Sequence, residues 1–456
     1  MYTLRRMLTA MIATALAASP AYAQRPDPLS ALVAEALRAN LGLRAERAAE
    51  ARQVQDLRAA RGFLLPSLTL DSRYTRLSGT PNIGDLINPA FGALNGLLGS
   101  NRFPTNLDLT LPARHDTHFR LTQPVFNLGI LAGVAVQRGR VDGQRMQRLA
   151  AARQLAADVQ IAWLEDASAR RVVDIYQASL ELVQESERVA ERLQAAGSAT
   201  PEALFRARAE RSDVEQQLAE ARTRRLAAAR EVNRLLQRPL DAPIADVPDS
   251  ALVFPLDLSA DDAVTRALAV REELAQADAG ARTADAAVRA ATAGFLPSVA
   301  VSVDYGFQGP DVTFSRATRY WTASVVASWS LFSGGGDAAR RAAAREDGER
   351  ARLLRRDLEA RIAAAARDAW DAAATARAAI ATAAARLESA RRTFELVRRR
   401  YQEGVASPIE FVDARTGYTN AELNQALTDY RYAIRWVVLE RVAGLRDLTP
   451  YEESRP

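Results

Sequence analysis

Hydrophobic and polar residues alternate in four stretches of this chain. Two stretches are 299–307 and 321–331, and a region with Gly, Pro and Asp separates them. The other two are 67–77 and 115–126. A period of two bounded by turn residues is typical of β-strands. The pattern therefore predicts two pairs of strands, one pair in each half of the chain.

The remaining residues mostly follow a helical pattern. Two of the expected helices, 130–196 and 337–403, contain no proline, and at 1.5 Å per residue each is a rod of about 100 Å. Their alanine-rich faces permit close approach, so we expect neighbouring helices to pack side by side in a bundle or a tube. The shorter expected helices are 29–61, 201–237, 260–293 and 408–445.

Three landmarks recur at nearly fixed distances along the sequence. The Gly-Phe-Leu-Pro-Ser motif at 294–298 has a counterpart at 62–67, and their prolines are 231 positions apart. Phe126 and Phe332 close the two strand pairs and are 206 positions apart, and the helix breaks at Gly197 and Gly404 are 207 apart. We therefore expect an internal tandem duplication, with a longer loop between the first two strands.

The first residues have the features of a secretory signal peptide. Arg5 and Arg6 form a basic region, 7–18 is apolar but too short to span a bilayer, and Ala21-Tyr22-Ala23 fits a cleavage site. No cysteine follows it, so we expect an exported protein without a lipid anchor. The expected divisions are a signal peptide at 1–23, a first repeat at 24–238, a linker at 239–259, a second repeat at 260–445 and a tail at 446–456.

Composition argues against several kinds of chemistry. The 456 residues include no cysteine and no lysine, which removes thiolate metal sites, P-loops and Schiff bases. The net charge of +5 is mild and interleaved, so nucleic acid is not an expected partner. His115 and His118 flank Asp116, where a loop-edge polar pair is the simpler alternative to a metal site. Gly334–Gly336 fit a strand-to-helix turn better than a phosphate site. We expect no enzyme activity, no metal and no cofactor.

Four strands cannot close into a barrel, and one copy would leave an apolar face and both sheet edges exposed. Because closed barrels are the β-structures that cross lipid, we infer a homo-oligomer that pools its strands in a membrane. A soluble antiparallel sheet packed on the helices is the alternative. Aromatic residues near the strand ends fit the interfacial girdles of a membrane barrel: Tyr74, Phe126, Tyr305, Phe307, Trp321, Trp329 and Phe332.

The chain resembles the TolC-type outer-membrane efflux protein family over essentially its whole mature length. The resemblance rests on the repeated order of elements, the Gly-Phe-Leu-Pro-Ser motifs, Phe-Ser-Gly-Gly at 332–335, and Tyr401-x-x-Gly404 followed by Val-Asp-Ala at 412–414. It implies an α+β fold in which three chains build a 12-stranded β-barrel in the bacterial outer membrane and a long periplasmic α-barrel. The implied partners are two further copies, outer-membrane lipid, a periplasmic adaptor and an inner-membrane RND or ABC pump.

The resemblance also implies roles for individual residues. Acidic rings at the periplasmic entrance correspond to Glu410 and Asp413, although Ser407 with Glu410 also fits a helix capping box. A closed-state latch corresponds to Tyr401. The chain has Ala203 and Ala406 where the family has an aspartate and an arginine, which leaves Glu202 and Arg206 as substitutes. The hairpin turns that would dock the adaptor contain Gly197, Thr200, Pro201, Gly404, Ser407 and Pro408.

The implied function is a passive exit duct for small molecules such as drugs, toxic compounds and metal ions, driven by the inner-membrane pump. A type I secretion channel for polypeptides and a non-transporting coiled-coil scaffold of the envelope are the alternatives. The region 79–114 is rich in Gly, Asn and Pro, and we expect a loop there. Whether this loop covers the outer mouth is left open.

Overall fold

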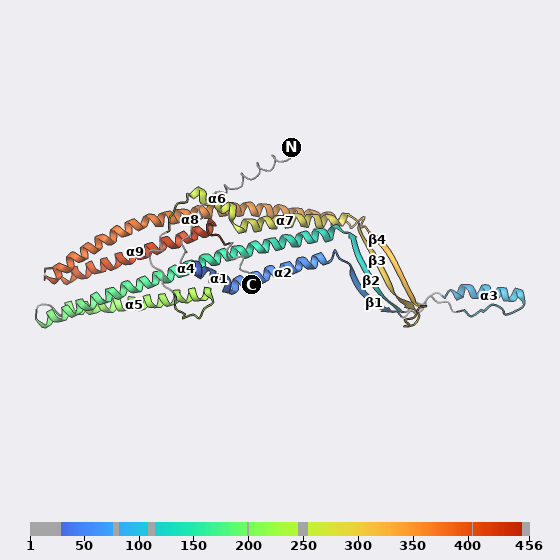
Figure 1. Cartoon of the computed structure of the whole chain (residues 1–456), viewed down its shortest axis with the longest axis horizontal. Coiled ribbons are helices and arrows are strands. Elements are labelled where there is room, and N and C mark those ends of the chain that lie inside the picture. The colour runs from blue at the N-terminus through green and yellow to red at the C-terminus, as the bar shows by residue number, and fades with distance from the viewer. Residues whose placement is uncertain are drawn as a thin grey trace, which may run out of the picture. The chain divides into compact units, whose positions relative to one another are not determined.

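The computed structural model describes residues 29–75, 82–107, 115–197, 200–244, 254–403 and 405–448. The expected signal peptide and residues 449–456 lie outside these ranges. The described part is mainly helical and contains a four-stranded antiparallel sheet, which confirms the expected α+β class (Figure 1). No helix within the described ranges is both long and apolar enough to cross a membrane.

The elements follow one another in the predicted order, apart from α3 and from two expected helices that are each divided in two. The helices are α1 (Ser30–Ala39), α2 (Leu41–Gly62), α3 (Gly84–Leu98), α4 (Leu128–Ala195), α5 (Pro201–Leu236), α6 (Ala260–Val270), α7 (Glu272–Thr292), η2 (Ala293–Phe295), α8 (Gly336–Gln402) and α9 (Pro408–Val442). The strands are β1 (Ser67–Tyr74), β2 (His115–Phe126), β3 (Ser298–Gly309) and β4 (Arg319–Ser328).

Contacts divide the chain into two compact units, and each unit takes segments from both halves of the sequence. The first comprises Met1–Arg44, Ala151–Val270 and Ala363–Pro456, and the second comprises Ala45–Ala150 and Arg271–Ile362. A unit in this sense is not a sequence repeat. The division into repeats at 24–238 and 260–445 therefore stays a prediction about the sequence.

Two expected helices are each broken once, at matching positions. The expected helix 29–61 is interrupted at Asn40, whose backbone is extended, and the expected helix 260–293 is interrupted at Arg271, also extended. Asn40 and Arg271 are 231 positions apart, the same distance that separates the two motif prolines. The side chain of Asn40 supports its break, because Oδ1 accepts from the Leu43 amide at 3.2 Å and Nδ2 donates to the Leu235 carbonyl at 3.1 Å. A helical period by itself does not reveal such a break.

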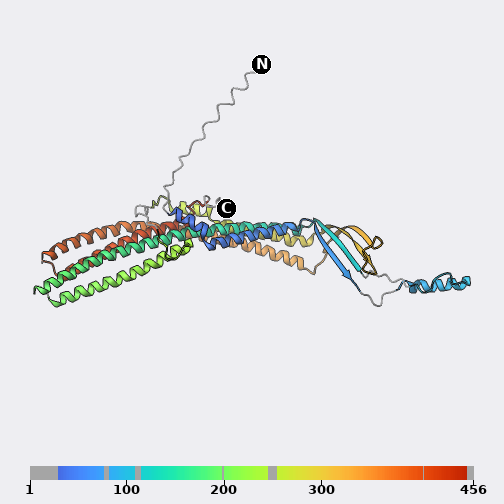
Figure 2. The same cartoon turned by 60° about the horizontal axis from the view of Figure 1, so that its bottom comes forward.

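In the first unit, α4 pairs with α5 and α8 pairs with α9 as antiparallel helices (Figures 1 and 2). Their core is centred on Trp163 of α4, which is fully buried. Val33 of α1, Val232 of α5 and Val437 of α9 belong to the same buried cluster. Burying apolar surface of this kind is the main force that holds the helices together.

The second unit contains the sheet, in the order β1-β2-β3-β4 with every neighbouring pair antiparallel. β1 and β4 are the edge strands. The last pair of the β3–β4 ladder is Ser298 with Ser328. The expected strand 321–331 therefore ends three residues early, because nothing in β3 remains to pair with Trp329 and Leu331.

The expected loop at 79–114 is wrong for its central part, where the structure has α3. Apolar residues recur there at a spacing of three to four, which is a helical period. The presence of Gly, Asn and Pro obscured this pattern. The residues that carry it are Ile83, Leu86, Ile87, Phe91, Leu94, Leu97 and Leu98.

Candidate functional site

The turns between the paired helices of the first unit carry most of the predicted site residues. Ser407 is the N-cap of α9, and its hydroxyl accepts a hydrogen bond from the Glu410 amide at 3.3 Å, with Pro408 at the first helical position. Thr200 holds the equivalent place before α5, but its side chain makes no capping bond. Gly197 ends the preceding turn with a positive φ of 72°, a conformation that glycine adopts without strain. Gly404 lies outside the described residues.

Glu410 and Asp413 lie on the first turns of α9, three residues apart and therefore on one side of the helix. Both side chains are exposed. The carboxylate of Glu410 has no hydrogen-bond partner among the described residues, so the structure contains the serine half of the expected capping box and not its glutamate half. This leaves both carboxylates free to face solvent.

Tyr401 packs as an aromatic residue in the described structure. Its ring stacks on Phe411, with centroids 4.7 Å apart and planes at 21°, and burial raises the pKa of its hydroxyl. Arg206 and Ala203 line the same small cavity as Tyr401, which has a volume of about 30 Å³. Glu202 is exposed and does not line it. The structure thus brings Tyr401 and Arg206 together and leaves Glu202 outside.

A buried arginine that the sequence did not single out joins three helices nearby. Arg415 of α9 is 3% exposed, and its Nη1 donates to the Ser179 hydroxyl of α4 at 2.8 Å. Its Nη2 forms an ion pair with Glu210 of α5. Burial lowers the pKa of this guanidinium, and Glu210 opposes that effect. Its spacing in the sequence could have indicated this burial, because a residue four positions after Phe411 lies on the same buried face of the helix.

The sheet of the second unit has one apolar and one polar face. Leu70, Phe119, Tyr305 and Trp321 occupy consecutive strands in one register row, and all four side chains are exposed. The opposite face carries the ion pair between Arg120 and Asp304, with Nε and Oδ1 2.8 Å apart. A single copy therefore presents a broad apolar face to solvent.

The other predicted girdle residues are placed at the two ends of this sheet. Tyr74 is paired with His115 at one end, and Phe126 is paired with Val299 at the other. Phe307 makes an edge contact with Phe314, with centroids 5.3 Å apart. Trp329 and Phe332 follow β4 and are exposed, and the Trp329 indole donates to the Phe295 carbonyl at 3.2 Å.

Solved outer-membrane channels have this fold. The Campylobacter jejuni CmeC outer membrane channel aligns with a TM-score of 0.73 at 17% identity, over 92% of this chain and 88% of its own. The open state of the Neisseria gonorrhoeae MtrE outer membrane channel aligns with a TM-score of 0.73 at 18% identity, over 92% and 89%. The Vibrio cholerae outer membrane protein VceC aligns with a TM-score of 0.73 at 16% identity, over 91% and 96%. At these identities the likeness shows the fold alone.

Sequence comparison supplies the family. Residues 263–445, nearly all of the second expected repeat, match the family described as outer membrane efflux protein. The second half of the chain is therefore similar in sequence to the outer membrane efflux protein family. Members of this family work as trimers with periplasmic adaptors and inner-membrane pumps. A search of curated protein sequences finds no match to this chain.

The family match over residues 263–445 indicates an outer-membrane protein with a helical extension in the periplasm. The predicted site residues that the structure describes fall in two places. The turn residues, the acidic pair and the aromatic Tyr401 belong to the first unit, and the aromatic girdle residues belong to the second.

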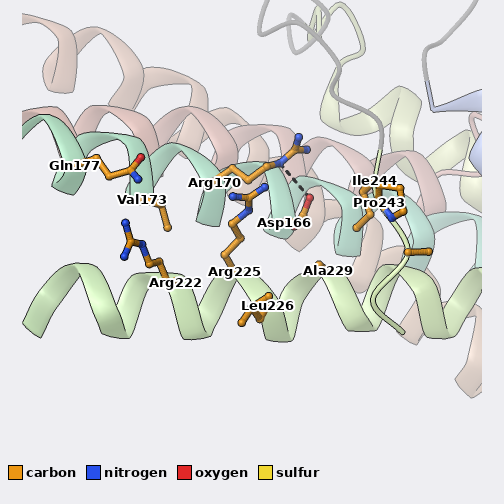
Figure 3. A pocket seen from close by; sticks show the side chains of 11 residues that line it. Asp166, Arg170, Val173, Gln177, Arg222, Arg225, Leu226, Ala229, Pro243 and Ile244 are labelled. Carbon is orange, nitrogen blue, oxygen red and sulfur yellow. Dashed lines mark ion pairs between the residues drawn. The ribbon is translucent and has the colours of Figure 1, made fainter. Parts of the chain in front are cut away.

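A basic groove of about 470 Å³ lies between α4 and α5 in the first unit (Figure 3). Asp166 is 2% exposed at its base, and Arg170 lies 3.1 Å from it, measured between Nε and Oδ2. Arg222 and Arg225 line the opposite side. Burial raises the pKa of Asp166, while the charges of Arg170 and Arg225 oppose that effect. No cluster of potential metal ligands occurs among the described residues.

Proposed function

We propose that three copies of this chain form a passive exit duct through the outer membrane. One observation carries this proposal. The four-stranded sheet has unpaired edges at β1 and β4 and an exposed apolar face that includes Leu70, Phe119 and Trp321. Joining β1 of one copy to β4 of the next pairs the edges, and closing the ring with three copies turns the apolar faces toward lipid. The family supports this number of copies.

The polar face of the sheet would then line the duct. Thr69, Asp71, Ser302 and Asp304 lie on that face, opposite the apolar row. The aromatic residues near the two sheet ends would contact the interfacial regions of the membrane. The related channels CmeC and MtrE are described as outer membrane channels, which supports the same use of the fold here.

The paired helices would continue the duct into the periplasm. Their turns, at Gly197–Pro201 and Gly404–Pro408, are the proposed docking points for a periplasmic adaptor, which connects the duct to an RND or ABC pump in the inner membrane. Glu410 and Asp413 point to solvent from the turn at the start of α9. Three copies would place six carboxylates around the entrance, where they attract cations and repel anions.

The closed entrance would be held by contacts between the α4–α5 and α8–α9 pairs. Tyr401 and Arg206 share one cavity and are the proposed latch, since Glu202 lies outside it. Packing on Phe411 of α9 fixes the tyrosine ring within the α8–α9 pair, and the shared cavity brings it to Arg206 of α5. The proposed cargo is small molecules, and the support for it is the match of residues 263–445 to the outer membrane efflux protein family. The pump would select the substrate. Export of polypeptides by a type I system remains the alternative.

Gene deletion in the native host tests this function. We expect deletion to raise susceptibility to small toxic compounds at least fourfold, and a copy of the gene to restore resistance. The same strain should secrete polypeptides normally. Loss of a secreted polypeptide with unchanged susceptibility would assign the protein to type I secretion. A strain unchanged in both respects would support a non-transporting scaffold.

A further inference from the structure

The segment inserted between β1 and β2 folds into a small hairpin of its own. α3 runs beside the segment 100–107 (Figures 1 and 2). Two asparagine side chains of α3 hydrogen-bond to the backbone of this segment. The Asn88 side chain donates from Nδ2 to the Leu107 carbonyl at 2.9 Å, and its Oδ1 accepts from the Leu107 backbone amide at 2.8 Å. The Asn95 side chain makes the same pair of bonds with the backbone of Phe103, at 2.6 and 2.9 Å.

One side of this hairpin is an exposed apolar ridge. We define the leucine ridge as Leu86, Ala90, Leu94 and Leu97, which fall within about 80° of one another at 100° per residue. Leu86 is 80% exposed and Leu97 is 85% exposed. α3 carries a single charge, Asp85. A ridge this apolar on a helix this poor in charge needs a partner.

The other side of the hairpin is hollow. A cavity of about 350 Å³ is lined by Gly92, Asn95, Gly96, Gly99, Ser100, Asn101 and Thr105, and we call it the glycine hollow. The polar atoms of Asn95 are already bonded to Phe103. Three of the seven lining residues are glycines, so the hollow has room for a side chain of another molecule.

The three glycines within α3 do not share one explanation. A Cβ at Gly84 would lie 1.8 Å from the Leu107 carbonyl oxygen, so the hairpin itself requires that glycine. A Cβ at Gly92 would make an ordinary contact of 3.9 Å with Thr105. A Cβ at Gly96 would meet no atom within 4 Å. Glycine weakens a helix relative to alanine, and no close contact within one copy requires a glycine at position 96. The space beside Gly96 is therefore open to another molecule.

We propose that the leucine ridge of each copy docks into the glycine hollow of the next, so that three α3 hairpins close a ring at the end of the duct. This inference rests on the proposed trimeric function. A threefold ring requires two different and complementary surfaces on each copy, and the ridge and the hollow supply them on opposite sides of one helix. α3 also follows directly on β1, the edge strand at which the neighbouring copy of the proposed trimer begins.

The dimensions suit a cover over the duct. α3 has 15 residues, which makes it about 22 Å long at 1.5 Å per residue. A closed barrel of roughly 12 strands, with about 4.8 Å between strands and about 40° of tilt, is roughly 24 Å across. The chain enters and leaves the hairpin from the strand ends at Tyr74 and His115, opposite the ends that join the long helices. Three such hairpins would span the mouth.

A neighbouring copy fits the ridge better than a lipid surface does. Helices that lie in a membrane interface carry basic residues on their polar face and often tryptophan on the other. α3 has no Arg, Trp or Tyr. Its polar side is instead used to hold the segment 100–107 through Asn88 and Asn95.

Cysteine cross-linking tests the ring, and the chain offers a background without cysteine. Two differently tagged full-length chains are co-expressed, one with Leu97→Cys and the other with Asn101→Cys, and the trimers are oxidised in the outer membrane. We expect a covalent adduct that carries both tags and disappears on reduction. Gly96→Leu in the second chain fills the hollow and should reduce the adduct about tenfold. Gly280→Leu is the matched control, because a Cβ at Gly280 also meets no atom within 4 Å but Gly280 lies in α7.

The outcomes separate the ring from the trimer. Trimers without any cross-tag adduct would overturn the ring and leave the proposed duct intact. A bimane label on Leu97→Cys that is strongly quenched by brominated lipid would overturn it as well, since the ridge would then lie in the membrane. An adduct unaffected by Gly96→Leu would show that the ridge does not occupy the hollow. Absence of trimers altogether would contradict the proposed function itself.

Discussion

The Arg415 guanidinium donates a hydrogen bond to the Ser179 hydroxyl, with 2.8 Å between Nη1 and Oγ, and so joins α9 to α4. Both residues are 3% exposed. The same guanidinium pairs with Glu210, which adds α5 to the connection. A charge this deeply buried is stable only while its partners remain in place. One side chain of α9 therefore connects to both helices of the α4–α5 pair.

Removing Glu210 should destabilise the protein more than removing Arg415. Glu210→Gln leaves a buried guanidinium without its carboxylate, which costs about 3 kcal/mol, whereas Arg415→Leu leaves a partly solvated glutamate and costs less. The double variant should be more stable than Glu210→Gln alone. Circular dichroism of thermal unfolding in detergent measures the order. Arg391→Leu, which breaks an exposed pair with Glu388, is the control and should change stability by about 0.5 kcal/mol at most. Equal losses for Glu210→Gln and Arg415→Leu would contradict the burial argument.

Asp413→Ala should raise single-channel conductance in planar bilayers and reduce the preference for cations. The reason is that three carboxylates would leave the narrowest part of the proposed entrance. Glu410→Gln should act in the same direction. Asp357→Ala, at an exposed ion pair on α8, serves as the control and should leave both properties unchanged. Unchanged conductance and selectivity in Asp413→Ala would remove this residue from the entrance.

Asp166 should make stability depend on pH. Burial raises its pKa in the folded protein, so the folded state binds the proton more readily than the unfolded chain does. The favourable contribution is fully present below the ordinary pKa of an aspartate and is lost as the pH rises through the raised value. Relative to Asp166→Asn, the wild type should therefore become more stable as the pH falls from 7 toward 4. Arg170→Gln should move this dependence to higher pH, because the arginine charge lowers the pKa of Asp166. Parallel curves for the wild type and Asp166→Asn would refute the assignment.

Asn95→Ala should loosen the α3 hairpin without unfolding the rest. The substitution removes both bonds to Phe103, and bonds of this kind contribute about 1 kcal/mol each. Hydrogen exchange of the segment 100–107 should become about tenfold faster or more. Asn106→Ala is the control, since Asn106 is exposed in the same segment and makes neither of these bonds. Deleting the hairpin should leave folding intact, and failure of trimers to assemble would show that it does more than cover the mouth.

The sequence predicted the elements that have a short hydrophobic period or a clear capping or turn residue at their ends. Alternation placed all four strands, and Ser407 with Pro408 placed the start of α9. The break at Asn40 was missed because it arises from a contact with Leu235, 195 residues away. α3 was missed because its glycines and Pro89 outweighed a helical period that was present in the letters.

The site residues divide in the same way. Residues at turns could be placed because caps and glycines are local signals. Arg415 could not be assigned a partner, since Ser179 and Glu210 come from two other helices and only packing brings them to it. The role of Glu410 was ambiguous in sequence, and the structure shows its amide, not its carboxylate, in the cap.

Native mass spectrometry of the protein released from detergent tests the central claim most directly. If neighbouring copies pair the two open strand edges, the protein should appear as a single species of three chains. Because the apolar sheet face would then be covered by lipid or detergent, the protein should lose solubility when detergent is removed. A monomer that stays folded and dissolved without detergent would contradict the exit duct.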